Sequence, residues 1–242
     1  LEKKYYKFFG LNLTMETLDG LLKHNGSVIN SKPYRKILTN NFFNKKIVFP
    51  NSPSLEAQVA SISDDIAYNN HDLEDGLRAG LFTIDQLTSL PLISQLIKKH
   101  IKQKKHFKKE IIISQIVRDL INIMVTDVII TTNKNLKKNK IKLIDDIYLQ
   151  KQEIVSFSDK VKKIDREVKD FLLENMYNNK KVLINTNRGK KIIKDLFNCL
   201  LKNPKKYITN ELFKEDSKER VVADFIAGMT DRYAINLHNN IK

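Results

Sequence analysis

The chain has 242 residues, of which 41% are hydrophobic and 29% are charged, enough apolar material for one large helical domain or two small ones. Its longest apolar runs fall well short of the roughly 20 residues of a spanning helix, and no apolar secretory signal opens it, which excludes a transmembrane protein. Its 43 basic and 28 acidic residues give a net charge of +15, which suits a polyanionic partner, although a lysine-rich composition alone produces the same surplus.

Glycine and proline are scarce, and apolar residues recur at three- and four-residue spacing, so we predict an all-α protein. The single cysteine, Cys199, cannot form an internal disulfide and indicates a reducing, cytoplasmic environment. A first helix is expected at 14–25, and the polar segment 30–53 is expected to be a loop. Further helices are expected at 83–90, 92–104, 110–133, 160–176, 189–201 and 217–239, with a charged linker at 134–142.

The helix with the clearest boundaries is expected from Ser54 to about Glu74. Pro53 precedes it, Ser54 can cap it, and Glu56 lies in the first turn, where the helix dipole favours an anion. Its apolar side is expected to consist of Val59, Ile62 and Ile66.

A polar stripe follows this same helix. Asp64, Tyr68 and Asp72 recur every four residues, which places them on one face at about 3.6 residues per turn. A carboxylate suits a hard divalent metal, a phenol can stack or donate a hydrogen bond, and a second carboxylate can accept one from a sugar hydroxyl. A solvated polar face has the same spacing, so the pattern alone leaves both interpretations open.

Three blocks of sequence carry a resemblance to a known family. They are Gly10-Leu-Asn-Leu-Thr14 with Gly20-Leu-Leu-Lys-His-Asn-Gly26; residues 54–60, 64–72 and 75–80; and residues 222–234. In these blocks the chain resembles the bacterial deoxyguanosinetriphosphate triphosphohydrolase-like proteins of the HD-domain superfamily.

This resemblance implies an HD-domain-like helical bundle that hydrolyses a deoxynucleoside triphosphate to the deoxynucleoside and triphosphate. It also implies a divalent metal such as Mg²⁺ or Mn²⁺, which activates water and polarises the phosphate. By the same match Asp64 is a metal ligand, with the adjacent Asp65 as the second candidate. Tyr68 contacts the sugar, and Asp72 accepts from its 3′-hydroxyl.

The resemblance also implies residues that contact the phosphates. Lys23 lies in the segment that contributes a cation to them, and His24 beside it assists. Arg232, in the last block, can pair with a phosphate in the forked geometry that arginine favours, although a structural ion pair explains it equally well.

The sequence departs from the family pattern in its metal ligands. The family holds its metal with two histidines and two aspartates, three of them upstream of the block that begins at Gly10. Nine residues precede Gly10 here, and none is His or Asp. We therefore predict that this is the C-terminal, substrate-binding portion without the N-terminal metal-binding helices, and that it does not hydrolyse dNTPs alone.

Two domains are expected. Residues 1–133 would form the remaining HD-type core, which includes the substrate-binding helix 54–74, and residues 134–242 a helical region packed on that core. Expected partners are a dNTP, an upstream HD-containing half and further copies of the chain, with an exposed apolar patch beside helix 54–74. Two other functions stay open: a non-catalytic dNTP-binding or regulatory module, and a basic nucleic-acid-binding helical protein.

Overall fold

The computed structural model describes residues 11, 13–24, 26, 52–103, 108–209 and 217–241. Every secondary-structure element in these ranges is a helix, which confirms the all-α prediction. Most of the expected loop at 30–53 lies outside the described residues. No helix within the described part combines the length and apolar character needed to cross a membrane. The chain divides into two compact units, Leu1–Leu173 and Glu174–Lys242.

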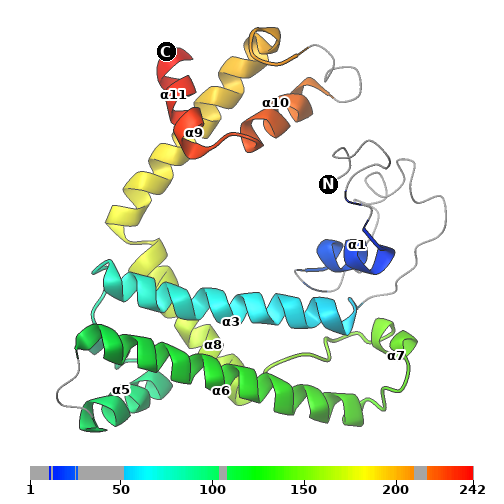
Figure 1. Cartoon of the computed structure of the whole chain (residues 1–242), viewed down its shortest axis with the longest axis vertical. Helices are drawn as coiled ribbons and strands as arrows, with labels where there is room; N and C mark the ends of the chain where they lie inside the picture. Colours follow the sequence, from blue (N-terminus) through cyan, green and yellow to red (C-terminus); the bar gives the residue numbers. More distant parts are fainter. Residues whose placement is uncertain are drawn as a thin grey trace. The chain divides into compact units, whose positions relative to one another are not determined.

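The first unit is built around the long helix α3. This helix packs against α1, α6 and α8, and α5 packs against α6. Figure 1 shows α3 and α6 side by side along much of their lengths. The helices of this unit are α1 (Met15–Leu22), α3 (Leu55–Arg78), α4 (Ile84–Leu87), α5 (Pro91–Gln103), α6 (Lys109–Lys138), α7 (Ile144–Tyr148) and α8 (Asp159–Leu172).

Helix α3 begins as the sequence predicts and extends one turn further, to Arg78. Ser54 caps it, because its hydroxyl accepts a hydrogen bond from the backbone N–H of Ala57 at 3.3 Å. Its buried side differs from the expected apolar stripe: Ile66 is buried, but Val59 is 49% exposed. Polar side chains share the buried side with Leu73 and Gly76; they are Gln58, Asn69 and Asn70.

The buried Gln58 connects the start of α3 to the segment that precedes α8. Its side-chain oxygen accepts hydrogen bonds from the backbone N–H groups of Ile154 at 2.8 Å and Val155 at 3.0 Å. Its amide nitrogen donates to the carbonyl of Pro53 at 2.9 Å. Gln58 therefore satisfies three backbone groups where two distant segments meet.

The expected domain boundary at 133/134 falls inside α6, which continues to Lys138, so half of the expected charged linker is helical. The compact units separate instead after Leu173. There α8 ends and a π-helical segment, Leu173–Tyr177, takes the place of the end of the helix expected at 160–176. Asp127 of α6 ties the start of α8 to this unit, because it accepts from the N–H and the hydroxyl of Ser158, each at 2.7 Å.

The second unit consists of α9 (Lys180–Lys202), a short 3₁₀ segment (Pro204–Lys206), α10 (Lys218–Ala227) and α11 (Asp231–Ile241). Helix α9 packs on α10 and α11, and Leu196, Leu200 and Val222 are fully buried among them. The single helix expected at 217–239 is thus two helices. Thr230 separates them, and its hydroxyl accepts from the N–H of Tyr233 in the first turn of α11.

Candidate functional site

The polar stripe of α3 lies on the side of the helix that turns away from its buried residues. Tyr68 is 58% exposed, Asp64 is exposed and Asp72 is half-buried. Four-residue spacing places the three one above another on this side, as the sequence predicts. Asp64 has no ion-pair partner among the described residues, so its carboxylate is available to a ligand.

Asp65, one residue further, is held by α8 instead. The ammonium group of Lys169 lies 3.3 Å from Asp65 and 3.0 Å from Asp165. Asp165 also accepts a hydrogen bond from the amide of Asn69 at 3.0 Å. Burial by itself lowers the pKa of Lys169. The hydrogen bond and charge of Asp165, together with those of Asp65, have the larger opposite effect, so the pKa of Lys169 is raised overall. This network fixes the turn of α3 that carries Asp64.

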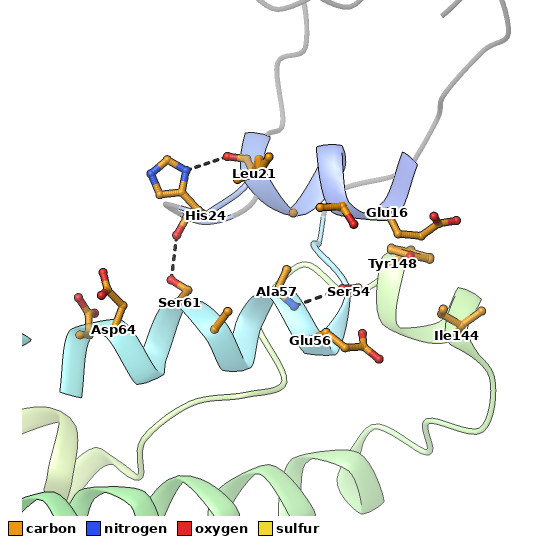
Figure 2. Close-up of a pocket in the computed structure, with 14 residues that line it drawn as sticks. Glu16, Leu21, His24, Ser54, Glu56, Ala57, Ser61, Asp64, Ile144 and Tyr148 are labelled. Carbon is orange, nitrogen blue, oxygen red and sulfur yellow. Dashed lines mark hydrogen bonds between the residues drawn. The ribbon is translucent and has the colours of Figure 1, made fainter. Parts of the chain in front are cut away.

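A pocket of about 660 Å³ opens beside Asp64 and Asp65, between α1, the first half of α3 and α7. Figure 2 shows Asp64 at one end of it, with Glu16, Tyr148 and Ile144 toward the other. Its lining consists of Glu16, Thr17, Gly20, Leu21, His24, Ser54, Glu56, Ala57, Ala60, Ser61, Asp64, Asp65, Ile144 and Tyr148.

The lining of the pocket combines apolar residues with acidic ones. Four carboxylates line it, and none of its described lining residues is Lys or Arg. Burial raises the pKa of Tyr148, and the negative charges of Asp19, Glu16 and Glu56 raise it further. Burial likewise raises the pKa of Glu153, with a contribution from Asp65. The field at this end of α3 therefore attracts cations and repels phosphate.

Lys23 and His24 occupy different environments. Lys23 is buried, its ammonium lies 2.8 Å from a carboxylate oxygen of Asp19, and it also donates to the carbonyl of Ser52 at 3.4 Å. It is absent from the described lining of the pocket, so its contact with phosphate stays a prediction. His24 lines the pocket: its Nδ1 lies 2.8 Å from the carbonyl of Leu21, and its own carbonyl accepts from the hydroxyl of Ser61 at 2.8 Å.

Arg232, the other predicted phosphate contact, lies in the second unit. It is exposed in the first turn of α11, beside Asp231, with which that helix begins. Its contact with phosphate stays a prediction.

The described residues do not fit a complete metal site. Nowhere among them do three or more His, Cys, Asp or Glu side chains gather as metal ligands would. Asp64 and Asp65 are adjacent, but Lys169 neutralises the second. A divalent metal takes about four to eight ligands, so Asp64 could supply only one of them.

The sequence alone did not predict the walls of the pocket. Glu16, Tyr148 and Ile144 come from α1 and α7, far from Asp64 in the sequence. Helix α7 has five residues and was not predicted at all. Only tertiary packing brings these residues together, and no local pattern signals it.

Comparison with known proteins gives the family context. A family model described as a phosphohydrolase-associated domain matches residues 155–240. A deoxyguanosinetriphosphate triphosphohydrolase-like protein of Pelagibacter ubique is 51% identical over 241 residues, which cover 100% of this chain and 65% of the relative. Proteins of the same name from Bartonella tribocorum and Leptospira interrogans are 36% and 38% identical, and the match covers all of this chain and 62% of each relative. The chain is a homologue of these triphosphohydrolase-like proteins.

The resemblance inferred from the sequence blocks is thereby confirmed, and it extends over the whole chain. The chain spans about 62–65% of the length of these relatives. The phosphohydrolase-associated domain begins at residue 155, just before α8, and so includes Lys169, which holds Asp65. The pocket, in contrast, is formed by residues before this domain.

Proposed function

We propose that this chain provides the substrate-binding wall of a dNTP triphosphohydrolase, which releases the deoxynucleoside and triphosphate from dGTP or a similar dNTP when its metal site is complete. The observation that carries the proposal is the outward line of Asp64, Tyr68 and Asp72 on α3. Homologues named deoxyguanosinetriphosphate triphosphohydrolase-like support the substrate class.

The chemistry of the three side chains fits a nucleotide sugar beside a metal. An exposed tyrosine ring offers an apolar surface for the deoxyribose, and its hydroxyl can donate or accept a hydrogen bond. Asp72, one turn further, can accept from the 3′-hydroxyl. Asp64, one turn before Tyr68, would be one ligand of the divalent ion, which supplies Lewis acidity when bound.

We further propose that the chain alone binds a dNTP without hydrolysing it. The described residues provide Asp64 but no group of three metal ligands, and the acidic lining of the pocket disfavours a triphosphate until a cation neutralises it. The same observations favour a second candidate function, a dNTP-binding module without catalysis.

The test titrates dGTP into the purified chain, with and without Mn²⁺, and assays deoxyguanosine and triphosphate by chromatography. Binding that Tyr68→Ala and Asp72→Asn each weaken about tenfold or more, without product, supports the proposal. Tyr233→Ala is the matched control, because Tyr233 is an exposed tyrosine of the second unit. Binding that none of these variants changes would contradict the assignment to α3.

The two candidate functions differ in what a second polypeptide restores. The remaining part of the Pelagibacter relative, which this chain does not match, is added to the chain in the same assay. Release of triphosphate that depends on Asp64 supports the enzyme portion. Binding without release in the mixture supports the non-catalytic module.

A further inference from the structure

The exposed line of side chains on α3 continues beyond Tyr68. His71, Asp75 and Arg78 follow it at intervals of three, four and three positions, and all three are exposed. Alternating steps of three and four residues keep such a line straight, because an α-helix has about 3.6 residues per turn. From Asp64 to Arg78 the exposed polar residues at these steps therefore form one straight line along the helix.

Arg78, at the end of α3, is fixed in place by two neighbours. Its Nε and Nη2 donate to a carboxylate oxygen of Glu74 at 3.2 Å and 2.6 Å, and Nη2 also donates to the hydroxyl of Ser114 on α6 at 3.4 Å. That hydroxyl donates in turn to Glu74 at 2.9 Å. The remaining nitrogen, Nη1, makes no hydrogen bond with a described residue, so its N–H groups are available to a ligand.

Asp75, one turn before Arg78, has an available carboxylate. No described residue donates a hydrogen bond to it or forms an ion pair with it. The hydrogen bond with Glu74 raises the pKa of Arg78 most, and the negative charges of Glu74 and Asp75 raise it further, so Asp75 lies close to Arg78. A carboxylate only accepts hydrogen bonds and a guanidinium only donates them. An acceptor and a donor thus stand side by side on one turn of α3.

The proposed substrate sets a direction along this line. In a deoxynucleoside triphosphate, the triphosphate and the base leave the sugar on either side of the ring oxygen and point away from each other. With the metal and the α-phosphate at Asp64 and the sugar at Tyr68 and Asp72, the base points toward the end of α3. Asp75 lies 11 positions beyond Asp64, roughly 16 Å along the helix, which the metal, one phosphate, the sugar and a purine together can span.

We propose that His71, Asp75 and Arg78 bind the base of the substrate and select guanine. This inference rests on the proposed function and names the base that the same site takes. The imidazole ring of His71 offers a flat surface on which a base can stack. The carboxylate of Asp75 accepts from N1–H and from the N2 amino group, and Nη1 of Arg78 donates to O6.

The order of donors and acceptors favours guanine over the other bases. The base-pairing edge of guanine presents two neighbouring donors, the N2 amino group and N1–H, followed by the acceptor O6. Adenine has a lone pair on N1, which would face the carboxylate of Asp75 without a hydrogen bond. Cytosine and thymine each have an acceptor next to their donor and are also smaller. A site built to pair with polar groups strongly rejects a ligand that leaves those groups unpaired.

Binding of dGTP, dITP and dATP to the chain in the presence of Mn²⁺ tests the selection. The base of dITP has the N1–H and O6 of guanine but not its N2 amino group. Affinity is expected to fall in the order dGTP, dITP, dATP, with about tenfold or more between dGTP and dATP. Equal affinity for dGTP and dATP, while Tyr68→Ala still weakens both, would overturn the base assignment and leave the proposed function intact. Absence of binding by all three nucleotides contradicts both.

Substitution of Asp75 gives a sharper test. Asparagine offers one acceptor and one donor in place of two acceptors, which is the pattern that matches adenine. Asp75→Asn is therefore expected to weaken dGTP binding about tenfold and to strengthen dATP binding, so that the preference is reversed. Asp85→Asn is the matched control, because Asp85 is an exposed carboxylate of α4 and its loss removes the same charge. A change of equal size for all three nucleotides, or the same change in both variants, overturns the proposal.

The other two residues are expected to respond differently. Stacking does not depend on the identity of the base, so His71→Ala should weaken all three nucleotides by a similar factor of about tenfold. Arg78→Met should weaken dGTP and dITP, which both have O6, and leave dATP within about twofold. Unchanged helical circular dichroism in each variant separates a lost contact from misfolding. An Arg78 variant that weakens dATP as much as dGTP contradicts the contact with O6.

Discussion

The ammonium group of Lys23 lies 2.8 Å from a carboxylate oxygen of Asp19, one turn before it, and both side chains are almost completely buried. Lys23 also donates to the carbonyl of Ser52, so it connects α1 to the approach to α3. Burial raises the pKa of Asp19, and the hydrogen bond and charge of Lys23 counteract this. The residue expected to contact phosphate thus has a structural role in the first unit.

Replacing Lys23 by Met distinguishes a structural role of Lys23 from a role in binding phosphate. Removing one partner of a buried ion pair leaves the other charge unpaired, so the free energy of unfolding in urea is expected to fall by about 3 kcal/mol. Lys163→Met is the control, because Lys163 and Glu167 form an exposed pair at 3.8 Å with the same spacing, worth about 0.3 kcal/mol. Loss of dGTP binding with unchanged stability would instead assign Lys23 to the phosphates.

Substitution of Gln58 is expected to lower the free energy of unfolding of the first unit more than most single substitutions would. In Gln58→Leu, the N–H groups of Ile154 and Val155 and the carbonyl of Pro53 lose their partners in a buried position. Each unsatisfied group costs about 1–3 kcal/mol, so a loss of about 3 kcal/mol or more in urea unfolding is expected. Gln95→Leu, at an exposed position of α5, should change stability by less than about 0.5 kcal/mol. Equal effects of the two substitutions would contradict the role of Gln58.

The contact between α5 and α6 predicts a specific response to acid. Asp119 accepts from Lys99 at 2.9 Å and lies 3.1 Å from Nε2 of His100. The hydrogen bond with Lys99 lowers the pKa of Asp119 most; burial opposes it, and His100 lowers the pKa further. The folded-state pKa of Asp119 lies below the ordinary value of 3.8, so the ionised carboxylate stabilises the folded chain. Its contribution to the free energy of unfolding is complete above about pH 4 and is lost as the pH falls through the folded-state pKa.

Urea unfolding at about pH 7, 4 and 3 tests this response. Asp119→Asn is expected to be less stable than the parent chain at neutral pH, and the difference should shrink as the medium becomes acidic. Asp75→Asn, an exposed carboxylate of α3, serves as control. Parallel pH profiles for the parent and Asp119→Asn would show that the carboxylate does not stabilise the contact.

Much of the helical structure could be predicted because its signals are local. Ser54, Pro53 and Glu56 mark the start of α3 in any context, and the four-residue spacing alone places Asp64, Tyr68 and Asp72 on one side. The break at Thr230 was missed because neighbouring apolar residues, such as Ile226 and Ala234, keep a helical spacing across it.

Burial was harder to predict, because it depends on packing between distant segments. Val59 has the right spacing for the core, yet α3 turns it outward, whereas the polar Gln58 is buried since the segment before α8 supplies its partners. Lys23 is buried for a similar reason, because the carbonyl of Ser52, distant in the sequence, accepts a hydrogen bond from its ammonium group. Val59 and Tyr68 are both exposed, but nine positions place them on opposite sides of α3, so the expected apolar patch beside the helix 54–74 stays a prediction.

Two glycines in long helices should respond to alanine with opposite signs. At Gly76 of α3 an added Cβ would overlap the ring of Phe82, which is buried and packs edge-on against Phe171 with ring centres 5.0 Å apart. Because Phe82 is almost completely buried, we expect the overlap to outweigh the helical preference of alanine. Gly76→Ala is expected to lower the free energy of unfolding by about 1–3 kcal/mol.

At Gly189 of α9 an added Cβ meets nothing within 4 Å. Gly189→Ala should therefore raise stability by about 0.5–1 kcal/mol, because alanine loses less backbone entropy in a helix. Since the two residues lie in different units, hydrogen exchange resolved by residue should report the first change in α3 and the second in α9. Stabilisation by both substitutions would mean that the ring of Phe82 can shift away from α3 to accept the added methyl group.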